Sequence, residues 1–356
     1  MQNLTHEKEN YTAEGQGCGC QAATTGRYQS DRLPCYAGNV PPIRVYRKEV
    51  GRQIPAIVDI PHKSLYPRKP KPYTGGMSVT VCIAISCDCH RLDAQPKFLL
   101  ISDRKISTGA TSTDYGFKVA DVGVGWYSMF AGNDVSMVNS VTRLAADMTR
   151  RIEDGQWAKP SAELVKQSMT QAYHHIRRGQ IKDRLLSHFN WDIPDFLREA
   201  ISSLPPQELA FLHNEIRNFD LGCEFLVCGF DEAVGEEPVF VHIQNPGTAT
   251  LATVNSGYWS IGTGATSALA YLNWKQQSWR TPLALSIYNG IAAKVFAEKA
   301  SDVGQTTNVI IVEHNSDEPK MLTDEQTNQI KSIWLREEVN IKPENLIERI
   351  NNILGM

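Results

Sequence analysis

The stretch Met77–Asp103, MSVTVCIAISCDCHRLDAQPKFLLISD, decides the fold of this chain. Its first part, Val79–Ile85, consists almost entirely of β-branched or small residues, and the polar segment Cys87–Pro96 separates it from a second apolar run, Phe98–Ile101. Two such runs around a polar connection predict an antiparallel hairpin. Hydroxyl side chains stand at the start of the first strand, and Asp103 stands where the second strand must end. A hydroxyl and an acid at the same end of paired strands can lie side by side.

The composition is that of an ordinary globular protein. Of the 356 residues, 42% are hydrophobic and 21% are charged, and the net charge of −3 gives no electrostatic case for binding nucleic acid. No run approaches the roughly 18 apolar residues of a membrane span. The N-terminal MQNLTHEKENYTAEG lacks the apolar core of a secretory signal. We therefore expect a cytoplasmic protein with no nucleic-acid partner and no membrane partner.

The cysteines show no pattern that favours a metal site. The pairs Cys18/Cys20 and Cys87/Cys89 leave only one residue between the two thiols, which is not the usual zinc spacing. Without a secretion signal, a disulfide framework is not expected either. We expect reduced thiols, no metal and no cofactor.

The chain divides into three parts by composition and period. Residues 1–76 are rich in Gly, Pro, Tyr and Arg and keep no apolar period, which predicts an extended or disordered segment. This segment could be a propeptide, a tail, or sequence upstream of a native start at Met77. One domain is expected at 77–315, with a helical insertion at about 180–220, and a C-terminal helical extension at 316–356.

The order of the elements predicts an α+β fold. Strands are followed by two helices, more strands, two more helices and a last strand, which favours two packed sheets with helices outside each. We expect a loop at 106–116, strands at 117–122 and 126–131, and a helix from an N-cap at Asp134 to about Ile152. A second helix is expected to begin at Pro160-Ser161.

Several of these features occur together in one known family. The stretch TVCIAI…FLLISDRKIS…GFKVADVGVGWYSMFAGND resembles the start of proteasome β-type subunits, and in particular bacterial proteasome-like members of the N-terminal nucleophile (Ntn) hydrolases. The later segments LGCEFLVCGFD, SIGTGATSALAYL and FAEKASDVGQTTNVIIV follow in the family's order. The resemblance covers about 80–313 and implies a four-layer αββα sandwich.

The resemblance also implies a set of site residues. The nucleophile is a hydroxyl at the start of the mature chain, Thr80 or Ser78, whose own α-amino group serves as the base. The paired charges Asp103 and Lys118 support it, and a backbone N–H at Gly132 holds the oxyanion. Two further residues, Ser301 and Asp302, resemble the family's supporting Ser/Asp pair. On this hypothesis, Lys118→Ala abolishes hydrolysis with little effect on folding.

The choice between the two hydroxyls stays open. Thr80 fits the family register, because the small Ala84 follows at the right distance, whereas Ser78 would be exposed by ordinary removal of Met77. Both have the same strand parity, so alternation does not separate them. Simpler interpretations also stand, since Asp103 could be a solvated turn acid and Lys118 an exposed charge at a strand end.

Three classes of function follow from these observations. The leading hypothesis is an Ntn amidohydrolase, a threonine or serine peptidase acting on a peptide or other amide substrate. The alternative is a non-catalytic proteasome-like scaffold or assembly subunit, and a homo-oligomer is left open in either case. A nucleotide-binding protein rests only on the two glycines of Ile261–Thr266, IGTGAT, with no P-loop lysine and no full GxGxxG. A close approach of helix and strand explains these glycines equally well.

Overall fold

The computed structural model describes the chain from Thr80 onward, with short gaps. The described ranges are 80–89, 94–108, 111–113, 116–123, 125–132, 134–152, 160–231, 235, 237–252, 256–299, 303–316, 318–337 and 343–356. All of them belong to one compact unit, Tyr66–Met356. They form a mixed α+β fold with two larger antiparallel sheets, which confirms the expected fold class at this level. The segment 1–76, Ser78, Ser301 and Asp302 lie outside the described residues.

The first sheet is built on the predicted hairpin. Its strands lie in the order β10–β1–β2–β11–β12. β1 and β2 pair antiparallel, with Cys82 opposite Ser102 and Ile85 opposite Leu99. The strand bounds are Cys82–Cys87 (β1), Lys97–Asp103 (β2), Tyr258–Ile261 (β10), Thr307–Glu313 (β11) and Lys320–Met321 (β12). β2 thus lies between the strand that opens the fold and a strand from near the end of the chain.

The second sheet follows the order of the chain. Its strands are β5 (Val119–Gly123), β6 (Trp126–Gly132), β7 (Cys223–Phe230), β8 (Pro238–Gln244) and β9 (Thr248–Leu251), each paired antiparallel with the next. The predicted strands at 117–122 and 126–131 are confirmed, with small shifts at their ends. Lys118 is the residue immediately before β5.

One predicted loop is wrong. Within 106–116, Ile106–Thr108 (β3) and Thr111–Thr113 (β4) form a small two-stranded sheet, with Ile106 opposite Thr113. The Ser, Thr and Gly content favoured a loop, but threonine and isoleucine are β-branched and fit a strand well. The strand β10 was also missed, because its four residues precede the helix that the glycine-rich segment predicts.

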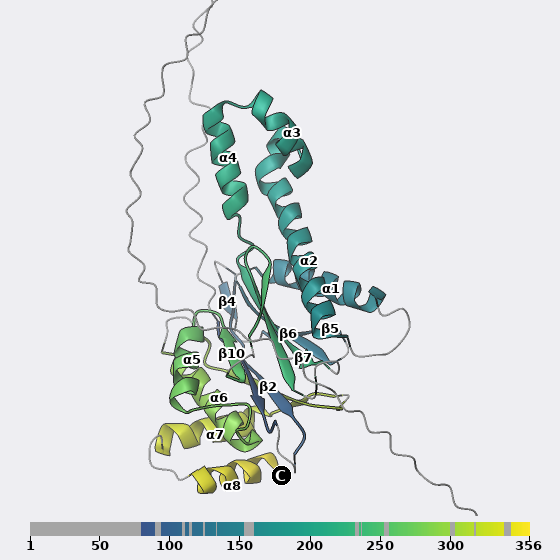
Figure 1. Cartoon of the computed structure of the whole chain (residues 1–356). Coiled ribbons are helices and arrows are strands. Elements are labelled where there is room, and N and C mark those ends of the chain that lie inside the picture. Colours follow the sequence, from purple (N-terminus) through teal and green to yellow (C-terminus); the bar gives the residue numbers. More distant parts are fainter. Residues whose placement is uncertain are drawn as a thin grey trace, which may run out of the picture. The chain divides into compact units, whose positions relative to one another are not determined.

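Helices cover both sheets (Figure 1). α1 and α2 pack against the second sheet, and α5, α6, α7 and α8 contribute to the core cluster of the first. Their bounds are Val135–Ile152 (α1), Ala162–Ile181 (α2), Ala265–Trp274 (α5), Leu283–Ala297 (α6), Asp324–Glu337 (α7) and Pro343–Leu354 (α8). The predicted start of α1 is confirmed, because the carboxylate of Asp134 accepts the backbone N–H groups of Ser136 and Met137 at 3.0 and 3.3 Å.

Three apolar clusters connect these layers. Alternate residues of a strand face opposite sides of its sheet. Ile83 and Ile85 accordingly belong to the cluster shared with α5–α8, whereas Cys82 and Ala84 belong to a cluster shared with β6, β7 and β8 of the second sheet. A further cluster joins the second sheet to α1 and α2. Thr80 has the parity of Cys82, so its side chain is expected on the side of the second sheet.

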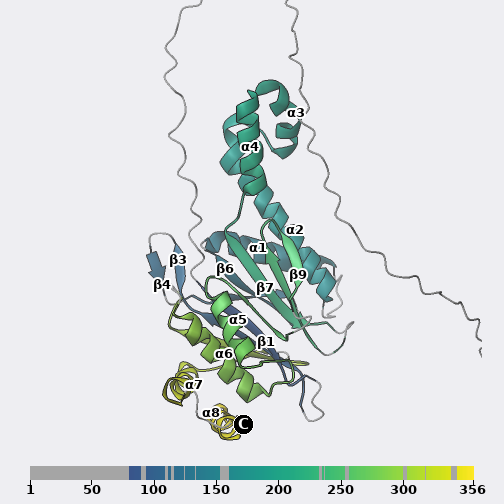
Figure 2. The ribbon, with the colours of Figure 1, turned by 60° about the vertical axis from the view of Figure 1, so that its left-hand side comes forward.

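The region between α2 and β7 is helical. It contains a π-helical turn (Lys182–Leu186), a short 3-10 turn (Ser187–Phe189), α3 (Ile193–Ser203) and α4 (Pro206–Asn218). These pieces have a small apolar cluster of their own. In both Figure 1 and Figure 2, α3 and α4 lie beyond the end of α2, away from the strands of the two sheets. They pack against one another and against the end of α2.

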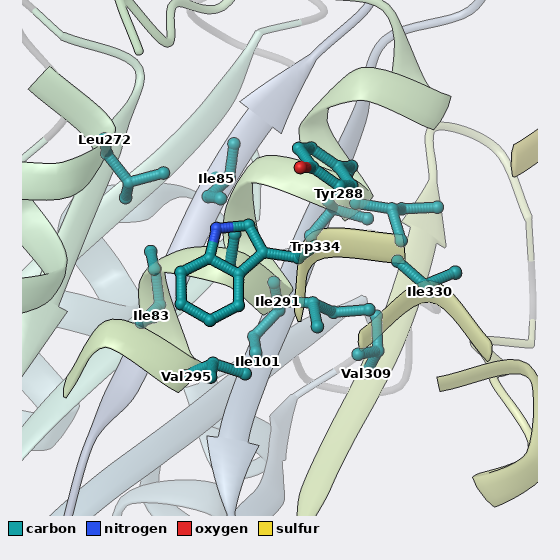
Figure 3. Close-up of a cluster of buried hydrophobic side chains, with 14 of the residues drawn as sticks. Ile83, Ile85, Ile101, Leu272, Tyr288, Ile291, Val295, Val309, Ile330 and Trp334 are labelled. Carbon is teal, nitrogen blue, oxygen red and sulfur yellow. The ribbon is translucent and has the colours of Figure 1, made fainter. Parts of the chain in front are cut away.

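The C-terminal helices contribute to the main core. Trp334 of α7 is 4% exposed, and its indole N–H donates to the hydroxyl of Tyr271 on α5 at 3.0 Å. Figure 3 shows the indole among apolar side chains from both strands and helices: Ile83, Ile85, Ile101, Leu272, Tyr288, Ile291, Val295, Val309 and Ile330. The end of the chain is thus part of the structure that holds β1 and β2 in place.

Candidate active site

Thr80 lies at the entrance of β1, with its backbone held on both sides. Its carbonyl accepts the N–H of Gly264 at 3.1 Å, and the next N–H, of Val81, donates to Asp103 Oδ1 at 3.1 Å. The Thr80 hydroxyl itself donates to Asp103 Oδ1 at 2.5 Å. The hairpin explains this contact, because β1 and β2 run antiparallel and bring the start of one beside the end of the other.

Asp103 is the hub of the site. It is fully buried at the end of β2, and both oxygens of its carboxylate accept hydrogen bonds. Oδ1 accepts from Thr80, Val81 and Lys118, and Oδ2 accepts the N–H of Gly304 at 3.1 Å. A solvated turn acid would be exposed, so this simpler interpretation is wrong.

Lys118 approaches from the second sheet. Its Nζ lies 2.7 Å from Asp103 Oδ1 and also donates to Thr80 Oγ1. The Lys118 side chain is 3% exposed, so it is not the exposed strand-end charge that was the simpler interpretation. A buried cation in contact with a hydroxyl oxygen can stabilise negative charge that develops on that oxygen. The three residues therefore form a compact group of nucleophile type, cation and orienting acid.

The glycine-rich turn between β10 and α5 packs against the backbone of Thr80. Gly262 has a φ of +90°, and a Cβ added to it would lie 2.5 Å from the carbonyl oxygen of Thr80. A Cβ on Gly264 would lie 3.0 Å from the Cβ of Val81. The close approach of this turn to the first strand thus explains both glycines. They give no reason to propose a nucleotide-binding site.

A second polar pair supports the same turn. The N–H of Gly262 donates to Glu224 Oε1 at 2.7 Å, and Glu224 Oε2 lies 3.1 Å from Nε2 of His242. Glu224 and His242 come from β7 and β8, so they link the second sheet to the turn behind Thr80. Neither residue was predicted from the sequence, because this contact joins segments that no local pattern connects.

The other predicted site residues are not joined to this group by the described contacts. Gly132 ends β6 opposite Cys223, and a Cβ there would lie 2.7 Å from the carbonyl oxygen of Gly222. Packing against β7 therefore explains this glycine, and an oxyanion role for its N–H stays a prediction. Ser78, Ser301 and Asp302 lie outside the described residues.

Arg104, which follows the central acid, points elsewhere. It donates to the amide oxygen of Asn308 at 2.5 Å and forms an ion pair with Asp324 at the start of α7. This pair holds the pKa of the exposed Asp324 carboxyl below its usual value, chiefly through the hydrogen bond from Arg104. Arg104 thus fastens α7 to the first sheet.

Among the described cysteines, Cys82 is the one whose thiol interacts electrostatically with Asp103 and Lys118. It is fully buried on the same side of β1 as Thr80. Burial raises the pKa of its thiol to about 12, even though the nearby charge of Lys118 acts in the opposite direction. A thiol must be ionised to act as a nucleophile. Cys82 is therefore a poor candidate at neutral pH, whereas the hydroxyl of Thr80 contacts both Asp103 and Lys118 directly.

No protein-family model matches the chain, and no curated protein matches it. Among the described residues, no group of three or more His, Cys, Asp or Glu side chains is placed to hold a metal ion. Within the same part of the chain, no helix combines the length and apolar character needed to cross a membrane. The five described cysteines are buried and free.

Proposed function

We propose that this chain is an Ntn-type amidohydrolase, similar to bacterial proteasome-like peptidases, with Thr80 as its nucleophile. The observation that carries the proposal is the contact of the Thr80 hydroxyl with both Asp103 and Lys118, two residues before the start of β1. A threonine that served only as a strand former would need neither a buried acid nor a buried lysine. The substrate would be a peptide or another amide.

The arrangement of the layers supports the fold that belongs to this function. An αββα sandwich needs one apolar cluster between the sheets and one between each sheet and its helices. The three clusters described above have these compositions. We therefore assign the four-layer αββα sandwich as part of the same proposal, with α3 and α4 as an insertion.

The proposed reaction proceeds through an ester. Thr80 Oγ1 attacks the carbonyl carbon of the amide while its proton passes to the α-amino group of the same residue. Lys118 stabilises the charge on the oxygen, and Asp103 keeps the ammonium in place. The protonated α-amino group then gives the proton to the leaving amine. Water hydrolyses the ester and restores the hydroxyl.

This mechanism requires that Thr80 be the first residue of the working chain. A peptide nitrogen cannot accept a proton at neutral pH, because its lone pair is delocalised into the peptide bond. Lys118 is already paired with Asp103. The contacts of the Thr80 hydroxyl support cleavage after Val79 over a start at Ser78.

One observation favours the second candidate function, a non-catalytic scaffold. Thr80 is only 2% exposed and Lys118 only 3% in the chain as it stands. A buried hydroxyl that is fully hydrogen-bonded can serve stability alone. The two candidates therefore differ in whether a chain that begins at Thr80 reacts with an external electrophile.

The deciding experiment compares defined N-termini. Chains beginning at Thr80, Ser78 or Met77 are released from a leader by a protease that leaves no extra residue. Each is treated with a β-lactone, which acylates nucleophilic hydroxyls, and with fluorogenic peptide amides. We expect a mass adduct and hydrolysis only from the chain that begins at Thr80.

The control is Thr80→Val, which keeps the side-chain volume and removes the hydroxyl. It should lose the adduct and at least about 10²-fold in hydrolysis. Reaction of the Ser78 chain alone would transfer the role to Ser78. Failure of both hydroxyl-start chains, with the fold confirmed by circular dichroism, would contradict the hydrolase and favour the scaffold. Native mass spectrometry of the same samples measures whether the chain forms a homo-oligomer.

A further inference from the structure

A buried lysine is connected to the candidate site through a single intervening residue. Lys294 of α6 has no exposed surface, which is rare for a lysine unless it is paired. Its Nζ donates to Glu298 Oε1 at 2.5 Å and to the carbonyl oxygen of Gly304 at 2.6 Å. Burial lowers the pKa of Lys294 to about 8, against the opposing effect of Glu298. Such a group is costly to bury, so its contacts call for an explanation.

Gly304 connects this lysine to the central acid. Its carbonyl accepts from Lys294, and its N–H donates to Asp103 Oδ2 at 3.1 Å. A Cβ on Gly304 would lie 2.6 Å from the Cβ of Lys105 and 3.0 Å from Asp103 Oδ2. Glycine is therefore needed for the backbone to come this close, and the direction of its peptide groups determines whether Asp103 receives a fourth donor.

A second lysine approaches the same turn without making the same contact. Lys331 of α7 donates to both oxygens of Glu298, at 3.0 and 3.1 Å, and to the carbonyl of Gln305 at 3.2 Å. The charged groups around Lys294 are thus Glu298 directly after its own helix, Lys331 on α7 and Asp103 at the end of β2. Lys331 shares the carboxylate with Lys294 but does not contact Gly304, which makes it a matched control.

We propose that Lys294 is a positioning residue for Asp103, acting through the backbone of Gly304. By holding the Gly304 carbonyl, it directs the N–H of that residue to Oδ2, which leaves Oδ1 for Thr80 and Lys118. The carboxylate then cannot rotate without losing a donor. The catalytic meaning of this role rests on the proposed function, whereas the contact itself does not.

The test of the contact is hydrogen exchange of the Gly304 amide, measured by NMR on glycine-labelled protein. In Lys294→Met, we expect this amide to exchange at least about tenfold faster relative to amides of β7, which report global unfolding. In Lys331→Met, it should remain within about threefold of the wild type. Equal effects of both substitutions, or an unchanged amide in Lys294→Met, would overturn the proposal.

The test of the catalytic role uses the chain that begins at Thr80. Lys294→Met should lower kcat by about 10- to 100-fold with KM within about twofold, because a misplaced catalytic group affects the transition state more than substrate binding. Lys331→Met should leave both constants near the wild-type values. An unchanged kcat in Lys294→Met would contradict the positioning role. If the wild type is inactive, the proposed function fails, and the amide exchange still decides whether Lys294 positions Asp103.

Discussion

The ion pair between Lys118 and Asp103 allows a quantitative test of the site. Both side chains are buried, and Nζ lies 2.7 Å from Oδ1. Lys118→Met leaves a buried carboxylate whose remaining donors are Thr80 and two backbone N–H groups. Removing one partner of a buried pair costs about 3–5 kcal/mol of unfolding free energy. Asp103→Asn leaves the ammonium uncompensated and should cost a similar amount.

The double variant separates the interaction between Lys118 and Asp103 from the contacts that each residue makes with its other neighbours. In Lys118→Met/Asp103→Asn no buried charge remains, and the asparagine oxygen still accepts at least one of the backbone N–H groups. We expect it to cost about 1–3 kcal/mol, the price of one imperfectly satisfied polar group. The coupling free energy between the two positions should therefore be at least about 3 kcal/mol.

The assay is urea unfolding of all four proteins, followed by circular dichroism and tryptophan fluorescence. The control is Asp324→Asn, which removes the exposed ion pair with Arg104 and should cost less than about 1 kcal/mol. Additivity of the two single substitutions within about 0.5 kcal/mol would refute the buried pair. A cost below about 1 kcal/mol for Lys118→Met would do the same. The expectation that Lys118→Ala spares folding is thereby revised, because it assumed an accessible lysine.

Three further outcomes can be measured independently. Deleting 1–76 should leave the melting temperature nearly unchanged, and a large drop would show that this segment stabilises the fold. Folding lowers the pKa of Lys294 from 10.5 to about 8, so the unfolded chain binds more protons than the folded chain between these pH values. The unfolding free energy should therefore rise with pH in this range, by up to about 3 kcal/mol. Urea unfolding of the wild type and of Lys294→Met across pH 7–11 tests this, and a difference between the two that does not change with pH would contradict it. Gly262→Ala should lower the unfolding free energy by about 2–4 kcal/mol, because the strain of positive φ adds to the clash with the Thr80 carbonyl. Gly222→Ala also has a positive φ but open space around the added Cβ, so it should lower the unfolding free energy by only about 1 kcal/mol in the same assay. Equal losses would exclude the contact between Gly262 and Thr80.

The central hairpin and the contact between Thr80 and Asp103 were accessible from the sequence because their signals are local. Apolar runs determine β1 and β2, and the antiparallel turn then brings Thr80 to Asp103. Lys118 could be named only through the resemblance, since nothing in its own segment shows that it is buried. Its burial follows from packing of two sheets, which no single segment encodes.

The supporting residues could not be predicted for a related reason. Gly304 contacts Asp103, and Lys294 contacts Gly304, only because β11 pairs with β2, with Thr307 opposite Asp103. A lysine in an apolar helix reads as an ordinary charge until its depth is known. One usable signal existed: Lys294 stands in a helix whose neighbours are otherwise almost all apolar or small, so it has no polar face to occupy.

The pairing of β2 with β11 also has a consequence for biosynthesis. The ribosome makes β1 and β2 early, but the strand that lies beside β2 and the glycine that binds Asp103 are made much later. Contacts between such distant segments form slowly, and the first sheet cannot be completed on a nascent chain that still lacks β11. Any self-cleavage that depends on the assembled Asp103 site is therefore delayed until synthesis has passed Gly304. Under the proposed function, this order of translation would keep the growing chain from cleaving itself too early.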